Sequence, residues 1–436
     1  MRITELTLHN YRNYRDFRID FGSEVTVLIG KNGSGKTNMI KAVKQLLSFI
    51  FSRRKGERQF TFISSSDRNI VKYKPLDARY GKDEGDEEFF YHYPISCSMK
   101  CSLAEDIPLE WTFEKSSFTS NVKASLYRKA NVMFWNAYYD GLIQLPVFAY
   151  FSDSYPHVDL NLSKTIRPLL ESGNPLPRNM GYYKWDDDKN CTEIWLQYFI
   201  MQYKKSRLQD DPEATRFVDS IREVLVKFSS PVSEYNPDTD IQLRDISLDF
   251  RGKGEVVALV YADGRRIPFT ELPAGYMRLF SMVMDIACRG YLLNRDCNPA
   301  GIVLIDELDL HLHPSVERTA LRRLRNTFTR IQWILSTHSP LVLSSFEQTY
   351  DKVLIYKILA EKNEVSFIPV ENMQGVDAST ALKYTMDTPE DDSLLNDYKE
   401  AYDFWKSKGD AERLANVKEL IKNIVGEYSL FYRTLD

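Results

Sequence analysis

The chain has 436 residues, of which 43% are hydrophobic and 27% charged, and its formal net charge is −4. These values are typical of a globular protein. They exclude a protein that covers nucleic acid with a strongly basic surface, although a local basic groove remains compatible with them. The five cysteines form no C-x-x-C pair, which argues against a disulfide framework and a thiolate zinc site. The first residues lack the apolar core of a signal peptide, and no run of 18 apolar residues occurs, so we expect a cytoplasmic protein without a membrane segment.

The first 29 residues are expected to form a β hairpin and one further strand. A turn at 9–13 separates two segments in which apolar residues recur on one face, the pattern of half-buried strands. These apolar residues are Ile3, Leu6, Leu8, Phe17, Ile19 and Phe21. A third, apolar run at 25–29 predicts the strand that leads into the next segment.

Residues 30–37 read Gly-Lys-Asn-Gly-Ser-Gly-Lys-Thr, a complete phosphate-binding loop of the form G-x-x-x-x-G-K-T. A strand precedes the loop and a run of helical periodicity follows it, which is the context that this motif requires. Backbone N–H groups of such a loop bind phosphate oxygens. We expect Lys36 to contact the β- and γ-phosphates and Thr37 to bind Mg²⁺. The predicted nucleotide-binding residues of the loop are Gly30, Asn32, Gly33, Ser34, Gly35, Lys36, Thr37 and Asn38.

The rest of the chain alternates between β-type and helical patterns. Polar loops are expected at 52–90, short strands within 90–150, mostly loops at 152–190, helices at 192–228, and a β segment at 241–269 with a hairpin turn at 262–264. Further on, helices are expected at 275–293 and 315–328, strands at 301–305, 331–336, 353–356 and 364–370, and a helical tail at 378–436.

Two of these strands end in polar residues that suit nucleotide chemistry. The apolar run Gly301–Ile305 is followed by Asp306 and Glu307, which indicates a buried strand that carries acids to its carboxyl edge. Asp306 is the expected partner of Mg²⁺, and Glu307 the expected general base for the attacking water. The alternative is a strand end followed by a helix-capping acid.

Histidines supply two more candidates. The strand at 331–336 leads to His338, which we expect to sense the γ-phosphate, unless it is a hydrogen-bonded histidine at the rim of the sheet. His311 and His313 have a spacing at which two histidines can bind a metal ion, but the absence of nearby thiolate ligands argues against metal binding.

Together these motifs resemble the ABC-type ATPases of the RecF/SMC group. The resemblance covers the phosphate loop, the run 302–307, Asp309, the stretch 311–314, His338, and the opening segment 3–14. It implies an α/β fold, namely a P-loop ABC-type ATPase head with an antiparallel β lobe and an inserted helical region. It also implies ATP and Mg²⁺ as ligands, bound between two heads.

In that group a Leu-Ser-x-Gly signature and the helix after it close over the ATP of the other subunit. The matching stretch here is 272–275, so the resemblance assigns Gly275 to the partner's γ-phosphate. Pro273 stands in the place of the serine and removes both a hydroxyl and an N–H. Slow hydrolysis, or a clamp held closed by ATP, follows from this departure.

Within the group, the stretches 145–151 and 178–183 and the Leu-Pro-Ala-Gly-Tyr helix start resemble the stand-alone AAA family ATPases of bacterial antiphage systems, such as the Septu ATPase PtuA and its retron-linked relatives. The resemblance implies a homodimer or a larger homo-oligomer that controls an effector nuclease. We expect that nuclease to be a separate protein, because the chain after residue 370 is too short for a nuclease domain. The expected parts are the N-terminal part of the ATPase head at 1–150, an inserted region at 151–240, the C-terminal part of the head at 241–370 and a helical tail at 371–436.

Several features leave alternatives open. A RecF-like repair clamp on DNA and an assembly scaffold stabilised by ATP are the competing functions. Basic residues that suit contact with DNA or RNA, or simple solvation, are Arg53, Arg54, Lys55, Arg58, Lys204, Lys205, Arg207, Arg318, Arg322, Arg323 and Arg325. Acidic residues that suit solvation or protein docking are Glu390, Asp391, Asp392, Asp397, Glu400 and Asp403. Gln144 is a candidate for the metal-linked glutamine of ABC-type ATPases.

Overall fold

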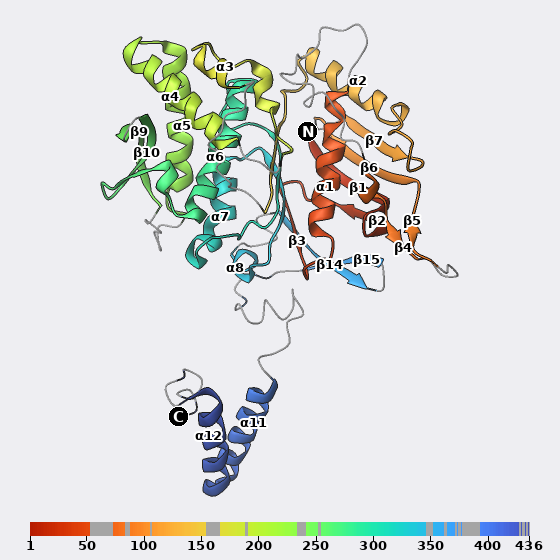
Figure 1. Ribbon diagram of the computed structural model, residues 1–436, viewed down its shortest axis with the longest axis vertical. Helices are drawn as coiled ribbons and strands as arrows, with labels where there is room; N and C mark the ends of the chain where they lie inside the picture. The colour runs from red at the N-terminus through yellow and green to blue at the C-terminus, as the bar shows by residue number, and fades with distance from the viewer. Residues whose placement is uncertain are drawn as a thin grey trace. The chain divides into compact units, whose positions relative to one another are not determined.

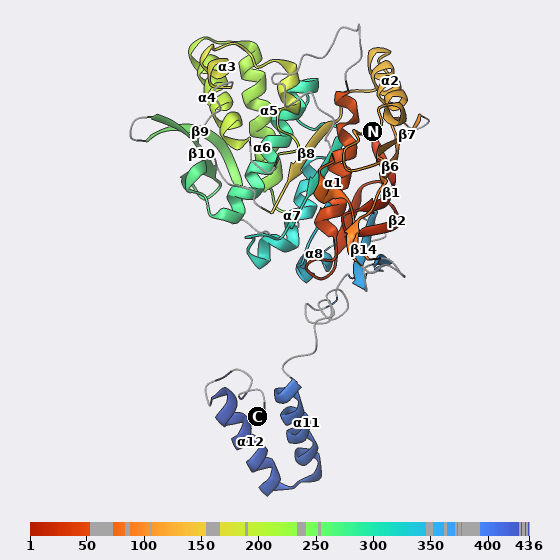
Figure 2. The same ribbon diagram turned by 45° about the vertical axis from the view of Figure 1, so that its right-hand side comes forward.

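The computed structural model divides the chain into two compact units, Met1–Ala378 and Ser379–Asp436, and each is considered by itself (Figures 1 and 2). The residues that the structure describes are 1–52, 73–82, 88–104, 107–153, 166–187, 191–232, 241–251, 254–345, 352–361, 364–370, 373, 376, 393–426, 429, 432 and 435.

The first unit is built around a six-stranded sheet in the order β15-β14-β3-β13-β12-β8. Its strands are β3 (Val25–Ile29), β8 (Val147–Phe151), β12 (Gly301–Ile305), β13 (Ile331–Ser336), β14 (Val353–Glu361) and β15 (Glu364–Pro369). Neighbouring strands are parallel, apart from the antiparallel pair of β14 and β15. Every residue of β3, β8, β12 and β13 is buried. Burial on both faces explains why these strands are nearly continuous apolar runs.

Helices lie on both sides of this sheet. Helix α1 (Lys36–Leu47) lies between it and a second, antiparallel sheet, whereas α5 (Pro212–Ser229), α6 (Ala274–Asn294) and α7 (Pro314–Thr327) lie on the opposite side (Figures 1 and 2). Because α1 is covered on two sides, its apolar residues are almost fully buried. The helix that follows the phosphate loop is therefore held firmly in the core.

The antiparallel sheet has four strands in the order β2-β1-β6-β7. They are β1 (Arg2–Tyr11), β2 (Tyr14–Asp20), β6 (Ile95–Ser102) and β7 (Pro108–Lys115). Buried and partly exposed residues alternate along β6, as expected for a sheet with one face in the core. The indole N–H of Trp111 in β7 donates a 2.9 Å hydrogen bond to the carbonyl of Leu46, which joins this sheet to α1.

Helix α2 (Ser125–Tyr139) covers the antiparallel sheet, and the prediction of only short strands in 90–150 is wrong there. This segment is rich in tyrosine, phenylalanine and tryptophan, which favour strands. Its buried residues nevertheless include Tyr127, Ala130, Asn131 and Phe134, which have the i, i+3, i+4, i+7 spacing of a helix face. Contacts such as the bond from Asn131 Nδ2 to the carbonyl of Phe49, 2.9 Å long, outweigh the local preference.

A helical region and a small β sheet complete the first unit. The helices are α3 (Arg167–Glu171) and α4 (Thr192–Leu208), together with α5. The three-stranded sheet consists of β9 (Leu243–Arg251), β10 (Gly254–Tyr261) and β11 (Arg266–Pro268). A buried ion pair between Arg289 and Asp285 of α6 anchors this region, since the indole of Trp195 in α4 also donates to Asp285 at 2.6 Å.

The second unit contains a helical hairpin, α11 (Ser393–Lys408) and α12 (Ala411–Val425). Gly409 has φ +69° in the turn, and Asp410 caps α12. The buried apolar residues of this unit include Tyr402, Ile421 and Leu435. The short elements elsewhere are η1 (Ser48–Phe51), η3 (Pro75–Asp77), β4 (Tyr80–Gly81), β5 (Phe90–Tyr91), η4 (Arg178–Tyr182), η5 (Phe269–Glu271) and α8 (Pro340–Leu343).

The predicted fold class is confirmed: the unit is α/β, with an antiparallel β lobe and a helical region. The strands predicted at 25–29, 301–305 and 331–336 have those bounds. The strand predicted at 353–356 is longer and extends to Glu361, because β14 also pairs with β15. The predicted boundaries between the parts of the chain stay a prediction.

Candidate nucleotide-binding site

Three polar segments follow three adjacent strands of the central sheet. The phosphate loop follows β3, residues 306–309 follow β12, and residues 337–339 follow β13. Because β13 pairs in parallel with both β3 and β12, the three segments lie at one edge. Ligands of open α/β sheets bind at this carboxyl edge, so the fold brings the three sequence motifs to one place.

The phosphate loop depends on a glycine at residue 35. Gly35 has φ +115°, and a Cβ there would lie 2.5 Å from Asn13 Nδ2 and 2.8 Å from the Tyr14 hydroxyl. The hydroxyl of Tyr14 donates a 3.0 Å bond to the Gly35 carbonyl, and Asn13 Nδ2 donates to the Ser34 carbonyl at 3.2 Å. The turn between β1 and β2 therefore contacts the loop so closely that only glycine fits at residue 35.

The same turn also holds the start of α1. Arg12 donates to Asn38 Oδ1 at 2.9 Å, and the amide of Asn38 donates to Asn13 Oδ1, also at 2.9 Å. Arg12 forms an ion pair of 2.7 Å with the buried carboxylate of Asp77. Sequence reasoning missed these supports, because the Asn-Tyr-Arg-Asn-Tyr stretch is a turn whose partners lie far along the chain.

The other predicted residues of the loop are arranged for an anionic ligand. The amine of Lys36 donates to the carbonyls of Gly30 (2.8 Å) and Lys31 (3.0 Å). The buried hydroxyl of Ser34 has no hydrogen-bond partner among the described residues, and a buried donor needs one. Asn32 and Gly33 are exposed and Thr37 is half-buried. The loop thus offers a cation, an unsatisfied hydroxyl and a helix N-terminus, which together suit a phosphate group.

The acids after β12 are held by a serine of the neighbouring strand. Asp306 is buried, and its carboxylate accepts a 2.6 Å bond from the Ser336 hydroxyl. The same hydroxyl oxygen accepts the N–H of Glu307 at 2.9 Å. Glu307 has φ +55°, a left-handed conformation that is uncommon for a residue with a side chain. The structure thus stabilises an unusual backbone at the predicted general base.

Arg278 of α6 is a further residue that the sequence did not single out. Its side chain is buried, and one guanidinium nitrogen donates to the carbonyls of both Asp306 (2.9 Å) and Glu307 (2.8 Å). The helix that begins at the signature-like stretch is therefore bonded directly to the backbone of the predicted acids.

The charges at this edge influence one another although they are far apart in sequence. Burial lowers the pKa of Lys36, and the carboxylates of Asp306, Glu307 and Asp309 oppose this change. The pKa of Glu307 is raised, first by burial and then by neighbouring carboxylates. A raised pKa makes a carboxylate a stronger base. The predicted base therefore has the electrostatic setting that its role requires.

His338 lies close to the phosphate loop. Its backbone N–H donates to Asp309 Oδ1 at 3.1 Å, and the Thr337 hydroxyl donates to the same oxygen at 2.5 Å. Burial and the charge of Lys36 lower the pKa of His338. The imidazole is therefore neutral near pH 7 and able to donate one hydrogen bond.

Gly275 is the second residue of α6, which begins at Ala274 after the N-cap residue Pro273. A Cβ at residue 275 would lie 2.4 Å from the carbonyl oxygen of His311. Packing within the chain therefore requires a glycine there. The predicted contact between Gly275 and the ATP of a second subunit stays a prediction.

The assignment of Gln144 is wrong. Val147 of β8 pairs in register with Gly301 of β12, so Gln144 precedes the amino end of its strand. Asp306 follows the carboxyl end of the neighbouring strand. Gln144 therefore lies at the opposite edge of the sheet from the phosphate loop.

The basic residues that suggested nucleic-acid contact are largely engaged within the fold. Arg323 is buried and donates to the carbonyls of Phe228 and Ser230. Arg325 forms a 2.9 Å ion pair with Glu24. Lys204 pairs with Glu255, Lys205 donates to the Gly173 carbonyl, and Arg322 donates to the Ser345 carbonyl. Arg53, Arg54, Lys55 and Arg58, and the acidic Glu390, Asp391 and Asp392, lie outside the described residues.

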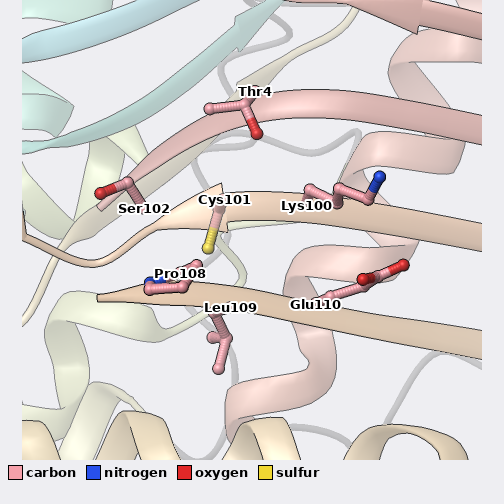
Figure 3. Close-up of a pocket in the computed structure, with 7 residues that line it drawn as sticks. All are labelled: Thr4, Lys100, Cys101, Ser102, Pro108, Leu109 and Glu110. Atoms are coloured by element: carbon pink, nitrogen blue, oxygen red, sulfur yellow. The ribbon is translucent and has the colours of Figure 1, made fainter. Parts of the chain in front are cut away.

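A pocket of about 490 Å³ lies in the antiparallel sheet, at the ends of β1, β6 and β7 (Figure 3). Its lining residues are Thr4, Lys100, Cys101, Ser102, Pro108, Leu109 and Glu110. Thr4 is at the opposite end of β1 from the turn that grips the phosphate loop, so this pocket is separate from the candidate site.

Within the described part of the chain, no three histidine, cysteine, aspartate or glutamate side chains lie close enough to hold a metal ion by themselves. In that same part, no helix combines the length and the apolar composition of a bilayer span.

Comparison with known proteins agrees with this geometry. The protein-family model described as "AAA ATPase domain" matches residues 1–141. A second family model, described as "AAA domain, putative AbiEii toxin, Type IV TA system", matches residues 137–344. The chain is 23% identical to the "Retron Vc95 probable ATPase" of Vibrio cholerae, over 88% of this chain and 78% of that protein. It is 22% identical to the "Retron Ec83 probable ATPase" of Escherichia coli, over 92% and 80%.

Among solved structures, the SMC head domain from Thermotoga maritima matches 85% of this chain and 100% of its own, with a TM-score of 0.45 and 13% identity. The resemblance to ATPases of the retron-linked kind is confirmed by the two sequence relatives. The two family models together account for residues 1–344, the part that carries the phosphate loop, the paired acids and His338. Residues 1–344 of the chain therefore consist of AAA ATPase domains, similar to those of the retron ATPases.

Proposed function

We propose that the chain binds ATP with Mg²⁺ at the carboxyl edge of the central sheet and hydrolyses it slowly in a head-to-head dimer. The observation that carries this proposal is the meeting of the phosphate loop, Asp306 with Glu307, and His338 on three adjacent strands. Lys36 binds the β- and γ-phosphates, Glu307 accepts a proton from the attacking water, and His338 donates a hydrogen bond to the γ-phosphate.

The residues present fit a magnesium ion that shares its ligands with the nucleotide. Thr37 and Asp306 are the residues that would hold it. The described side chains form no cluster that would bind a metal alone, which suits Mg²⁺, because this ion is usually bound by one or two protein groups plus phosphates. When bound, it neutralises part of the charge of the phosphates.

The dimer completes the site with α6 of the second subunit. The first turn of that helix, at Gly275, presents backbone N–H groups to the γ-phosphate. Pro273, the N-cap residue of this helix, supplies neither a hydroxyl nor a backbone N–H. We therefore infer slow turnover, in which the ATP-bound, closed dimer is long-lived.

We further propose that this dimer, or a larger homo-oligomer, controls a separate effector nuclease in bacterial antiphage defence. Two relatives with matches over most of their length are named as ATPases of retrons, which supports this assignment. The closed and open states of the heads would then switch the nuclease.

Two variants test this function. Lys36→Ala removes the phosphate-binding amine and should abolish ATP binding in a filter or fluorescence assay. Glu307→Gln should bind ATP, lose turnover and accumulate as a dimer in light scattering. Equal ATP affinity of the wild type and Lys36→Ala, or a monomeric Glu307→Gln protein with bound ATP, would contradict the proposal.

One observation favours a second candidate, an assembly scaffold in which ATP is structural. Pro273 caps α6 without a side-chain hydrogen bond, so the proposed dimer interface offers the ATP one hydrogen-bond donor fewer. Bound ATP that persists for hours in intact oligomers would select the scaffold. A RecF-like clamp is less well supported, because several basic residues are engaged within the fold; tight, salt-sensitive DNA binding by the isolated chain would restore it.

A further inference from the structure

The three-stranded sheet has an open edge at β9. This strand is the last in the order β11-β10-β9, and in the part of the chain that the structure describes no strand pairs with its outer side. The hairpin of β9 and β10 lies on the side of the helical region that is away from β1 and β6 (Figures 1 and 2). An edge strand presents unpaired N–H and C=O groups to which another strand can bond.

The hydrogen bonds of β10 show which residues of β9 point outward. The N–H of Tyr261 donates to the carbonyl of Arg265 at 2.8 Å, so the backbone of Tyr261 points toward β11. Backbone groups alternate in direction along a strand, so every second residue, counted back from Val260, points toward β9. The residues of β9 opposite these are Asp245, Ser247 and Asp249.

The residues between them therefore carry the outward N–H and C=O groups, and they are Ile246, Leu248 and Phe250. The N–H of Ile246 agrees with this, because it donates to Oδ1 of the neighbouring Asp245 at 2.7 Å. Edge strands are commonly protected by charged side chains or proline, but all three outward residues are apolar. Phe250 is 82% exposed. Outward backbone groups beside an exposed aromatic side chain are typical of a strand that pairs with another chain.

We propose that β9 pairs in antiparallel orientation with β9 of a second copy of this chain, about a two-fold axis at Leu248. In this register Leu248 stands opposite itself and Ile246 opposite Phe250, so that apolar side chains adjoin on one face of the extended sheet. On the other face Ser247 stands opposite Asp249, a hydroxyl beside a carboxylate. The strand is thus complementary to itself, as a two-fold interface requires.

Other two-fold registers fit less well. An axis at Ser247 would place Asp245 opposite Asp249, and an axis at Asp249 would place that carboxylate opposite its own copy. Like charges directly opposite each other destabilise a sheet. An axis at Ile246 would leave Phe250 beyond the partner's strand, which begins at Leu243. Only the axis at Leu248 covers the exposed aromatic ring without opposing two carboxylates.

This interface needs no nucleotide. If the proposed ATP dimer also forms, one chain has two different two-fold interfaces, and these link dimers into a larger homo-oligomer. That consequence rests on the proposed function, whereas the pairing of β9 does not.

The first test measures self-association of the full-length, nucleotide-free chain by sedimentation equilibrium. The wild type should associate as its concentration rises. Phe250→Lys should raise the dissociation constant by at least about tenfold, because each copy no longer buries an aromatic ring. The matched control is Leu208→Lys at the end of α4, which changes a side chain that is 80% exposed. A monomeric wild type, or equal dissociation constants of the two variants, would overturn the inference and leave the edge to an extended segment of another protein.

The second test determines the register. Residues in a hydrogen-bonded antiparallel pair have Cα atoms about 5.5 Å apart, within the range of a disulfide. Leu248→Cys should therefore form cross-linked dimers under mild oxidation, whereas Ser247→Cys, which does not stand opposite itself, should not. The natural cysteines are buried and give little background. Cross-linking of Ser247→Cys in preference to Leu248→Cys would refute the register.

A third comparison separates this inference from the proposed function. Lys36→Ala should abolish ATP binding and leave the cross-linking of Leu248→Cys unchanged, because the pairing of β9 involves no nucleotide. Loss of the cross-link in the Lys36→Ala background would contradict the inference, whereas ATP binding that survives in Lys36→Ala would contradict only the proposed function.

Discussion

The hydroxyl of Ser336, the last residue of β13, donates a 2.6 Å hydrogen bond to the buried carboxylate of Asp306. The two residues are 30 positions apart in the chain, but adjacent strands bring them together. Since the same hydroxyl oxygen accepts the N–H of Glu307, one small side chain orients both the expected metal partner and the backbone of the expected base.

Ser336→Ala should therefore affect both acids at once. It leaves a buried carboxylate oxygen and a backbone N–H without this partner, a change that costs about 1–3 kcal/mol of unfolding free energy. Turnover should fall more strongly than ATP affinity, because the phosphate loop is unchanged. Chemical denaturation and ATPase kinetics measure the two effects, and the exposed Ser116→Ala is the control. A variant with normal turnover would show that Ser336 does not orient the acids.

Arg278→Lys tests the connection between α6 and the turn that carries Glu307. A lysine keeps the charge but lacks the planar fork of donors, so the bonds to the two carbonyls are weakened. We expect a loss of about 1.5–3 kcal/mol in stability and a fall in kcat with little change in ATP affinity. The matched control is Arg318→Lys on the exposed face of α7. If the kcat of Arg278→Lys equals that of Arg318→Lys, Arg278 does not help to position Glu307.

Glu307→Gln should change the pH dependence of stability as well as activity. The pKa of Glu307 is raised in the folded chain, so its ionisation destabilises the fold as pH rises through that pKa. Glutamine removes this penalty. The nucleotide-free variant should have a higher Tm than the wild type at pH 8, and the difference should shrink as pH falls toward the ordinary glutamate pKa of about 4.3. Turnover should fall by about 10²–10⁴. Thermal melts across this pH range measure the effect, and a constant difference in Tm would contradict it.

Gly35→Ala and Gly33→Ala form a matched pair in the phosphate loop. Both residues have positive φ, but only at Gly35 would a Cβ collide with Asn13 and Tyr14; at Gly33 nothing lies within 4 Å. Each variant bears the cost of a left-handed alanine, about 1–2 kcal/mol, whereas Gly35→Ala must also displace the turn that grips the loop. ATP binding should be lost in Gly35→Ala and weakened only in part in Gly33→Ala, as measured by fluorescence titration. Equal affinities of the two variants would show that the grip of the turn is not needed.

The strongest sequence signals were those in which one local pattern decides both structure and chemistry. The loop at 30–37 and the run at 301–307 carry their own strand, turn and reactive groups, so the strands β3 and β12 and the roles of Lys36 and Glu307 were predicted from sequence. Helix α2 was missed, because its aromatic residues favour strands and its helical face is decided by packing against β7 and η1. Gln144 was assigned to the wrong edge, because the direction of β8 relative to β12 is a property of the sheet.

The sequence by itself determined that this chain has a phosphate loop, a pair of acids at a strand end and a histidine at another, since each lies in a segment whose hydrophobic pattern is unambiguous. Only the tertiary structure decided that these segments are neighbours, and that Arg12, Arg278 and Ser336 join them. The reason is physical: a hydrogen bond or a charge acts over a few ångströms, and the order of strands in the sheet, not the order of residues in the chain, decides which groups come that close.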